Sequence, residues 1–264
     1  MKIGIVGYGS VGKALADLFC SAADHELATY DKFLPDYATE YCRANINKCA
    51  LVFVCVPTPS LADGSAADVS AVEDVVGWIR PPICIKSTVI PGTTERLIER
   101  TRKSIVVSPE YMGESKGHPW GSPASCGFLI VGGQVETSEL VFEAYRACLG
   151  PTFTCFHTDE RTAELCKYME NAFLGMKVAF VNQFYDISMA LNVDWPDLRK
   201  LWLLDNRVGT SHTHVTADRG FGGRCLPKDM RALVAFMKDK GGAPLLEALL
   251  AYNEMVRRPT SRAS

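Results

Sequence analysis

The chain has 264 residues, of which 47% are hydrophobic and 22% are charged, which is enough for one large domain or two modest domains with packed cores. A formal net charge of −2 argues against nucleic acid or an acidic membrane surface as the main partner. Ten scattered cysteines, with no C-x-x-C pair and no nearby histidine at ligand spacing, argue against a metal site.

Nothing at the start of the chain resembles a secretion signal, because a strand-like segment, MKIGIVG, comes first. The longest apolar run, 49–56, is far too short to cross a bilayer. We therefore expect no membrane association and a cytoplasmic protein with reduced thiols.

The first elements along the chain are a strand, a glycine-rich turn and a helix. KIGIV (2–6) is apolar and β-branched, GYGSVG follows, and the apolar residues of 11–19 share one helical face. In this context the G-x-G-x-x-G spacing predicts a dinucleotide pyrophosphate bound at the helix N-terminus. The alternative is a plain glycine-rich turn. The residues expected to contact the cofactor here are Gly7, Gly9, Ser10, Val11 and Gly12.

A second strand, HELATYD, ends in Asp31, 19 residues after Gly12. A carboxylate at this place binds the ribose hydroxyls of NAD and repels the extra phosphate of NADP, so we expect NAD as the cofactor. The neighbouring Lys32, also expected near the cofactor, weakens this preference.

Further strand-like runs follow at 50–59, 83–93, 104–110 and 127–133, with a helix-like segment at 68–79 between two of them. This alternation predicts a doubly wound, mostly parallel α/β sheet of the Rossmann kind, in which ligands bind beyond the carboxyl ends of the strands. Each polar residue at those ends is either a ligand contact or an ordinary turn residue. The residues at these ends are Val56, Pro57, Thr58, Ser87, Thr88 and Glu110.

The second half of the chain has helical patterns. A helix of about nine turns is expected over 159–190, and shorter helices over 194–204, 227–240 and 244–256. We therefore predict a dinucleotide-binding domain at 1–155 and an all-helical domain at 156–264. Four polar residues of the long helix fall close to one line and either form a solvated stripe or supply a lysine and an amide to a substrate pocket. They are Glu164, Lys167, Asn171 and Asn182.

GFGGRCLPKD (220–229) places one cysteine in an unusual neighbourhood. Cys225 comes just before a predicted helix N-terminus and beside Arg224 and Lys228, and both features lower the pKa of a thiol. The three glycines are expected to open the backbone to a ligand, and Asp229 is close enough to hold a water or handle a proton. A buried, inert cysteine is the alternative, and it suits the other nine.

A dinucleotide site combined with an activated cysteine suggests an oxidation in two stages. Hydride loss turns an alcohol into an aldehyde, the thiolate adds to it, a second hydride loss gives a thioester, and water releases a carboxylate. A lysine beside the reacting oxygen would stabilise its developing negative charge.

Six motifs in register resemble the UDP-glucose/GDP-mannose dehydrogenases over residues 1 to about 256. They are GYGSVG, VPTPSLADGSAADVS, KSTVIPGT, SPEYMGE, AELCKYMENAFLGMKVAFVNQ and GFGGRCLPKD. The resemblance implies oxidation of the C6 alcohol of a nucleotide sugar to a uronic acid with two NAD. It also implies a homodimer formed through the helix 159–190.

Carried over position by position, the resemblance makes Cys225 the nucleophile and Lys167 the lysine that stabilises the oxyanion or handles a proton. Asn171 then binds near the same oxygen, and Asp229 and Thr88 hold the water. These assignments, with Glu110, form the expected catalytic set.

The resemblance also assigns residues around this set. Glu110 matches the acid linked to thioester hydrolysis, Glu114 matches its companion near the cofactor, and Arg207 matches an arginine that reaches the sugar nucleotide of a neighbouring subunit. The expected substrate contacts are Glu110, Lys167, Asn171, Arg207, Phe221, Gly222, Gly223 and Cys225.

The sequence departs from the family pattern in three places. Relatives normally continue for another domain that covers the nucleotide end of the substrate, so we expect a short form without it. Ser108 stands where an asparagine is usual. The loop 211–219 is longer than in some relatives, and its His212 and His214 either replace missing contacts or are solvated.

Two other functions fit parts of the pattern. A β-hydroxyacid dehydrogenase would use Lys167 and Asn171 and transfer one hydride, but it leaves GFGGRC unexplained. A non-catalytic NAD-binding scaffold would have no need to keep Lys167, Asn171, Cys225 and Asp229 together.

Overall fold

The computed structural model describes residues 1–21, 25–61, 66–113 and 120–257. The chain divides into two compact units, which are described separately below. Unit 1 comprises Met1–Leu61 and Ala67–Lys167, and the described part of unit 2 is mainly 168–257. The division falls inside one long helix, whereas the domain boundary predicted from the sequence, 155/156, precedes that helix and stays a prediction.

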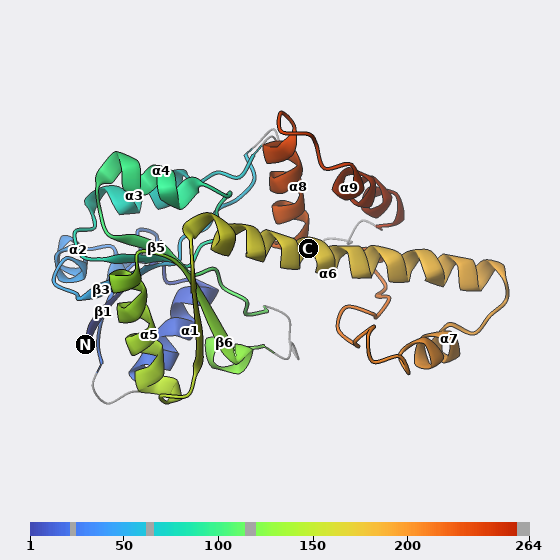
Figure 1. Cartoon of the computed structure of the whole chain (residues 1–264), viewed down its shortest axis with the longest axis horizontal. Helices are drawn as coiled ribbons and strands as arrows, with labels where there is room; N and C mark the ends of the chain where they lie inside the picture. The colour runs from blue at the N-terminus through green and yellow to red at the C-terminus, as the bar shows by residue number, and fades with distance from the viewer. Residues whose placement is uncertain (22–24, 62–65, 114–119, 258–264) are drawn as a thin grey trace. The chain divides into compact units, whose positions relative to one another are not determined.

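Unit 1 is built on a seven-stranded sheet (Figure 1). The strand order is β2-β1-β3-β4-β5-β6-β7, and every neighbouring pair is parallel except β5 and β6. The bounds are β1 Lys2–Val6, β2 Glu26–Tyr30, β3 Leu51–Val54, β4 Ile83–Ile85, β5 Ile105–Val107, β6 Phe128–Gly133 and β7 Thr154–Thr158. The prediction of a mostly parallel, doubly wound sheet is confirmed.

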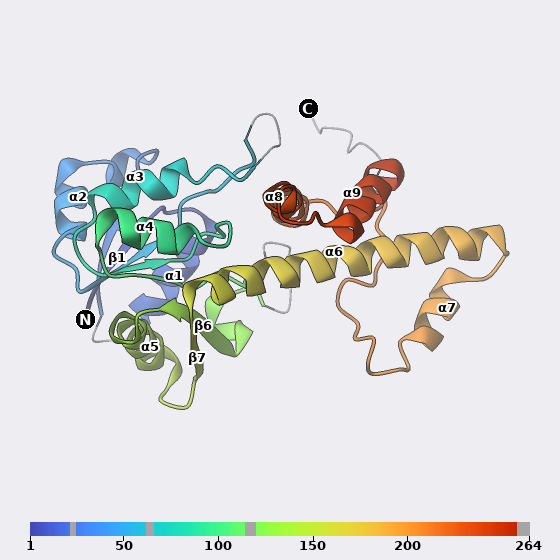
Figure 2. The same ribbon diagram turned by 45° about the horizontal axis from the view of Figure 1, so that its top comes forward.

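Helices cover both faces of this sheet (Figures 1 and 2). One hydrophobic core contains residues of α2, α3 and α4, and the other contains residues of α1 and α5. Successive strand residues alternate between the cores, as Phe53 and Val54 do, and burial on both faces explains why the strands read as continuous apolar runs. The bounds are α1 Ser10–Cys20, α2 Glu40–Ile46, α3 Ser70–Trp78, α4 Thr93–Thr101 and α5 Val135–Leu149.

The strand order reverses beside β1, which pairs with β2 on one side and with β3 on the other. Ligands of doubly wound sheets bind in the crevice outside the carboxyl ends of the strands at such a switch point. The glycine turn follows β1 and the segment 55–58 follows β3, so the predicted cofactor residues lie at this place in the sheet.

Unit 2 is helical, as predicted. It contains most of α6 (Glu160–Ala190), together with α7 (Trp195–Trp202), α8 (Leu226–Met237) and α9 (Pro244–Val256). α7 begins after Asp194, whose side chain accepts a hydrogen bond from the Asp197 amide, and Pro227 lies in the first turn of α8. The bounds of α9 match the predicted 244–256.

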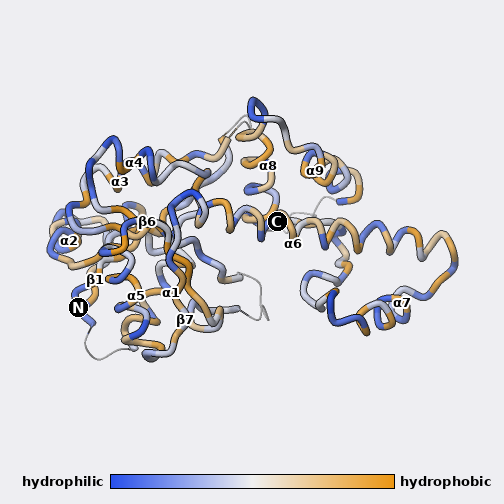
Figure 3. The backbone as a smooth tube through the Cα atoms, in the orientation of Figure 1, coloured by the Kyte–Doolittle hydropathy of each residue, from blue (hydrophilic) through white to orange (hydrophobic). Residues whose placement is uncertain are grey.

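The small core of unit 2 joins α6, α8, α9 and the loop before α8. Ala179, Phe221 and Met230 are buried together, with leucines of α8 and α9 packed against them. Hydrophobic positions recur along α6 and α9 (Figure 3). No helix among the described residues is both long enough and apolar enough to cross a membrane.

Candidate active site

The three glycines of the turn after β1 have three different surroundings. A Cβ atom at Gly7, where φ is +93°, would lie 2.7 Å from the Cys55 carbonyl oxygen, and one at Gly12 would overlap the Gly7 carbonyl. At Gly9 a Cβ would meet no protein atom within 4 Å. The first and third glycines are therefore needed for packing, while the second leaves the backbone open to a ligand, directly before the N-terminus of α1.

Asp31 ends β2 and is held in place by the backbone. Its Oδ2 accepts from the Tyr8 amide at 2.7 Å, and its Oδ1 accepts from the Phe33 amide at 2.8 Å. The carboxylate therefore lies against the glycine turn, where a ribose can reach it. Lys32 is exposed, and its ammonium lies 5.0 Å from the centre of the Phe33 ring.

The carboxyl ends of β3 and β4 are joined by hydroxyl groups. Thr58 is buried and donates to the Thr88 carbonyl at 2.8 Å, while Ser87 donates to the Val56 carbonyl at 2.6 Å. Pro57 is exposed between them. These hydrogen bonds link the two strand ends, and the contacts of Thr58 and Thr88 with the cofactor or a water stay predictions. Glu114 lies outside the described residues.

Glu110, after β5, is held by two backbone amides and an ion pair. Its Oε1 accepts from the amides of Tyr111 and Met112, each at 2.9 Å, and its Oε2 lies 3.3 Å from the Lys86 ammonium. Burial opposes the charge on Lys86, but Glu110 and the groups around it raise the pKa of this lysine above its ordinary value. The Lys86 ammonium also donates to the Ser108 hydroxyl at 3.4 Å. Lys86 was not among the site residues predicted from the sequence.

The polar line on α6 is buried, which excludes the solvated stripe. Glu164, Lys167, Asn171 and Asn182 are at most 7% exposed. Glu164 accepts from the Gly92 and Thr94 amides and from the Thr94 hydroxyl, so it caps the start of α4. Lys167 lies over the Tyr111 ring, 4.5 Å from its centre.

In unit 2, Asn171, Asp229 and Cys225 form a compact arrangement. The Asn171 amide donates to Asp229 Oδ2 at 2.6 Å, and Lys228 donates to Asp229 Oδ1. The Asp229 amide donates to the Cys225 carbonyl one turn back in α8. Cys225 is the N-cap of α8 and is exposed, whereas Asp229 is 1% exposed. An exposed thiol at a helix N-terminus meets the structural requirement for a reactive cysteine.

Other cysteines have the opposite environment. Burial raises the pKa of the Cys49 thiol to about 11 and that of the Cys84 thiol to about 12, so both stay protonated at neutral pH. All ten cysteines lie within the described residues, and none of them is in a disulfide. Only Cys20 and Cys225 of these ten are classed as exposed.

The glycines around Cys225 have different surroundings, and the expectation that all three open the backbone to a ligand is wrong for Gly220. A Cβ atom at Gly220 or Gly222 would collide with the side chains of Asn253 and Arg257, respectively. Gly223 alone of the three has no protein atom within 4 Å of the Cβ position. Gly220 thus makes room for α9, whereas Gly222 faces only the movable end of the Arg257 side chain, so its predicted substrate contact stays a prediction. Phe221 packs in the unit 2 core, so its predicted substrate contact stays a prediction.

The loop 205–219 contains the remaining candidates. Arg207 is highly exposed and pairs with Asp205, two residues earlier. The Arg199 guanidinium contacts His214 Nε2 at 3.0 Å and holds the carbonyl and hydroxyl of Thr213, while His212 contacts Ser211. The two histidines thus help to fold the loop.

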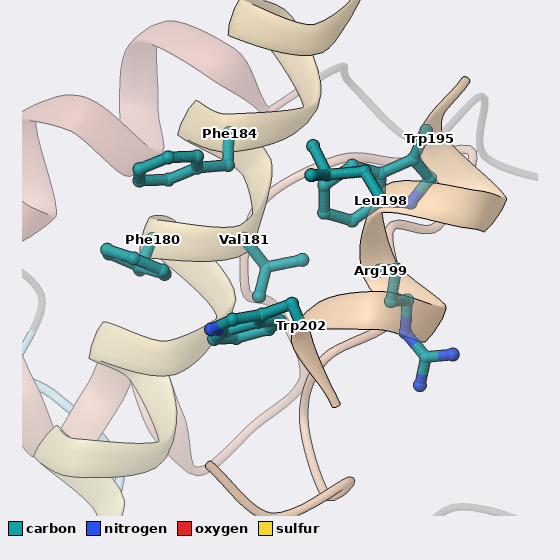
Figure 4. Close-up of a pocket in the computed structure, with 7 residues that line it drawn as sticks. All are labelled: Phe180, Val181, Phe184, Trp195, Leu198, Arg199 and Trp202. Carbon is teal, nitrogen blue, oxygen red and sulfur yellow. The ribbon is translucent and has the colours of Figure 1, made fainter. Parts of the chain in front are cut away.

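An apolar groove of about 290 Å³ lies between α6 and α7 (Figure 4). Phe180, Phe184 and Trp202 contribute aromatic rings to its lining, and Phe180 is within 5.8 Å of both other rings, measured between centroids. Arg199 is the one charged residue of its lining, so the groove offers no acid–base or nucleophilic chemistry. The full lining is Phe180, Val181, Phe184, Trp195, Leu198, Arg199 and Trp202.

Residues 36–137 match the NAD binding domain of the UDP-glucose/GDP-mannose dehydrogenase family, and residues 161–255 match its central domain. The chain belongs to this family. The resemblance noted in the sequence is thereby confirmed, and the family is one of NAD-dependent dehydrogenases.

Individual relatives of this dehydrogenase family support the same assignment. The UDP-glucose 6-dehydrogenase of Rhizobium meliloti is 31% identical over 227 residues, which are 80% of this chain and 52% of the relative. The chain thus spans about half the length of this curated relative.

Solved structures share the fold. A UDP-glucose dehydrogenase from Pyrobaculum islandicum superposes with a TM-score of 0.81 at 23% identity, over 96% of this chain and 68% of its own. A 3-hydroxyisobutyrate dehydrogenase from Mycobacterium tuberculosis superposes with a TM-score of 0.71 at 14% identity, over 96% of this chain and 93% of its own. The second match is named for a different dehydrogenase activity, so fold alone does not decide the reaction.

The residues of this family member fit NAD. Gly9 leaves the backbone open before α1, Asp31 is held beside the turn, and both lie at the switch point of the sheet. Gly7, Gly9, Gly12 and Asp31 would hold the cofactor, which when bound accepts a hydride from the substrate.

Proposed function

We propose that this protein oxidises the C6 alcohol of a nucleotide sugar, of the UDP-glucose kind, to a uronic acid with two NAD. The relatives are named for this activity on one nucleotide sugar, and the chain holds the NAD binding and central domains of the family. Since the chain spans about half of its curated relative, the activity and its substrate are proposals for the protein that carries this chain.

Cys225 is the proposed nucleophile. After the first hydride leaves C6, the resulting aldehyde accepts the sulfur, so that a C–S bond forms and the oxygen takes a proton. Loss of a second hydride and that proton leaves a thioester. Water then adds to the thioester carbon and breaks the C–S bond, which returns the thiol and releases the carboxylate. Overall, the reaction consumes one alcohol, one water and two NAD, and it produces one carboxylate, two NADH and three protons.

The neighbouring side chains have supporting roles in this proposal. Lys167 stabilises negative charge on the C6 oxygen, and Asn171 donates to the same oxygen. Asp229 orients the Asn171 amide through their 2.6 Å hydrogen bond. Glu110, fixed by two amides and Lys86, and Thr88 hold the hydrolytic water.

The observation that carries the proposal is the arrangement of Cys225, Asp229 and Asn171 within unit 2. An exposed thiol lies at the N-terminus of α8, one turn from a buried carboxylate that holds the amide of α6. A single-hydride dehydrogenase needs no such thiol, so this arrangement favours the two-stage oxidation.

The decisive experiment counts NADH. UDP-, GDP- and dTDP-hexoses are incubated with the purified protein and NAD, and NADH and acid product are measured. We expect two NADH per acid for one class of substrate. One NADH per product would favour the β-hydroxyacid type of reaction, and tight NAD binding without turnover would favour a non-catalytic scaffold.

Replacement of Cys225 tests the nucleophile directly. Cys225→Ala should abolish acid formation and leave NAD affinity within a few fold, because the glycine turn and Asp31 lie in unit 1. The matched control is Cys20→Ala, which removes the other exposed thiol and should leave turnover unchanged. An equal loss of NAD affinity in Cys225→Ala would contradict the assignment.

The protein is further proposed to be a homodimer that associates through α6. Large apolar side chains of this helix are left exposed in the single chain, among them Met169 (73%), Phe173 (53%) and Phe180 (47%). Phe180 also lines the apolar groove beside α7, and monomers rarely expose large apolar patches. A second copy with the same surface fits it by two-fold symmetry.

The charge-insertion variant Phe180→Glu tests this dimer. A carboxylate in the apolar interface costs several kcal/mol, enough to shift the protein to monomer at micromolar concentration. Sedimentation equilibrium should show a dimer for the wild type and a monomer for Phe180→Glu, while Leu245→Glu, an exposed apolar position on α9, should remain dimeric. A wild-type monomer contradicts the proposal.

The protein is also proposed to be cytoplasmic, because a reactive Cys225 thiol requires a reducing compartment.

A further inference from the structure

The loop before Cys225 is held by the side chain of Asn253, on α9. The Asn253 Oδ1 accepts from the Phe221 amide at 2.7 Å, and its Nδ2 donates to the Phe221 carbonyl at 3.0 Å. Asn253 is 4% exposed and Phe221 is 2% exposed. One amide side chain thus satisfies both backbone groups of one buried loop residue.

A second asparagine, on α6, holds the preceding residue. The Asn182 Oδ1 accepts from the Gly220 amide at 3.1 Å and from Arg219 Nε at 2.7 Å. Arg219 also pairs with Asp186 at 2.7 Å and lies 4.8 Å from the centre of the Tyr185 ring. The loop is therefore tied to two helices at consecutive residues.

The glycines are what allow α9 to come so close. At Gly220, where φ is +55°, any Cβ would overlap the Asn253 amide, and a Cβ at Gly222 would overlap the Arg257 guanidinium. Asn253 lies in the last turn of α9, and Arg257 is the residue that ends this helix. The C-terminal end of α9 therefore meets the loop at two glycines.

The anchored residue is close to the nucleophile in both sequence and packing. Three residues separate Phe221 from Cys225, and the Phe221 ring packs against Met230, which lies in α8. Fixing both the backbone and the ring of Phe221 therefore fixes the point at which the chain enters α8, where Cys225 is the N-cap.

From these contacts we infer that Asn253 is a positioning residue for Cys225. It sets the path of the loop so that the thiol stays at the N-terminus of α8, where the helix dipole and the backbone amides favour the thiolate. Asn182 supports the same path. The inference rests on the proposed function only in taking Cys225 as the nucleophile.

The test measures the reactivity of single cysteines rather than turnover. Wild type, Asn253→Ala, Asn253→Gln and the control Met255→Ala are alkylated with iodoacetamide from pH 6 to pH 10, and the rates at Cys225 and Cys20 are read by peptide mass spectrometry. Met255 is on α9 but 75% exposed, and Cys20 is an exposed thiol of unit 1 that serves as an internal reference. Asn253→Gln is included because the Asn253 Oδ1 already lies close against Gly220, so the longer side chain cannot keep the same hydrogen bonds.

In both Asn253 variants, the pH at which Cys225 is alkylated at half its maximal rate should rise by about one unit. Alkylation of Cys225 at neutral pH should therefore be about tenfold slower than in the wild type. The Cys20 rate should not change, and Met255→Ala should match the wild type. A folded Asn253 variant whose Cys225 midpoint and rate equal those of the wild type would overturn the inference. A simultaneous change at Cys20 would also overturn it, because it would indicate general unfolding.

Two further measurements keep the result interpretable. Hydrogen exchange of the wild type should show a protected Phe221 amide, and exchange at the rate of an open loop would overturn the inference without any variant. If the wild type makes two NADH per acid, Asn253→Ala should lower kcat while the KM for NAD stays unchanged. If the wild type makes none, the proposed function fails, but the alkylation result still decides the role of Asn253.

Discussion

At the scale of single residues, Glu164 shows how the long helix α6 is attached to the sheet domain. Its carboxyl group lies at the start of α4 and receives two backbone amides and the Thr94 hydroxyl. Burial outweighs these donors and raises the pKa of Glu164 from 4.5 to about 7. A carboxyl that the sequence left open as part of a solvated stripe is therefore a buried group whose pKa lies near neutral.

This shift predicts a pH dependence of stability. Because its pKa is higher in the native state, Glu164 binds its proton more tightly in the folded chain than in the unfolded chain. Its contribution to the free energy of unfolding is therefore greatest below pH 4.5 and is lost as the pH rises to 7. Glu164→Gln cannot titrate, so its free energy of unfolding relative to the wild type should rise by about 2 kcal/mol between pH 5 and pH 8. Urea unfolding at several pH values measures this difference. A constant difference across that range would refute it.

At the scale of elements, the ends of β4 and β5 are joined by the buried pair of Lys86 and Glu110. Their side chains are 2% and 10% exposed, and the charged atoms lie 3.3 Å apart. Each of these buried charges offsets the cost of removing the other from water. Removing one of them therefore leaves the other buried without a counter-ion. This pair is structural as well as being part of the proposed site.

Lys86→Met should therefore lower the free energy of unfolding by about 3–5 kcal/mol, since it leaves the Glu110 carboxylate buried without its counter-ion. The double variant Lys86→Met/Glu110→Gln should recover part of the loss, because no charge then remains. The same substitution at the exposed Lys48 is the control and should change stability by less than about 0.5 kcal/mol. Chemical denaturation measures all three, and a mild effect at Lys86 would contradict the prediction.

At the scale of the whole molecule, the cofactor is expected to stabilise the fold. A ligand that binds only the native state at one hundred times its Kd adds about 2.7 kcal/mol. NAD should therefore raise the Tm clearly, and NADP should raise it less, because the Asp31 carboxylate repels the extra phosphate. Asp31→Asn removes the charge and should narrow the difference between the two cofactors. Equal stabilisation of the wild type by both would show that Asp31 does not select NAD.

The sequence predicted the elements whose signals are local. The glycine turn, the cap at Asp194 and the helix 244–256 all have marker residues at their ends, and each was found where expected. The run 83–93 was read as one strand, but β4 ends at Ile85 and α4 starts at Thr93, after Pro91 and Gly92. α4 has few apolar residues and β7 has no alternation, so neither was predicted.

The candidate site was predictable where chemistry follows from residue type, as at Cys225 or Asp31. It was not predictable where the partners are far apart in the sequence. Lys86 meets Glu110 across two strands, and Asn253 meets Phe221 from 32 residues away. The presence of a glycine does not reveal what occupies the space beside it, so Gly220 was predicted to leave room for a ligand, whereas the Asn253 side chain of α9 fills that space.

The attachment of the loop to α9 has a consequence for how the protein is made. Asn253 is synthesised after Cys225. A growing chain that already contains the Cys225 thiol therefore still lacks the Asn253 side chain that fixes its loop. The nucleophile thus acquires its final surroundings late in synthesis. An incomplete chain that stops before α9 would contain every residue of the proposed chemistry and still lack a formed site.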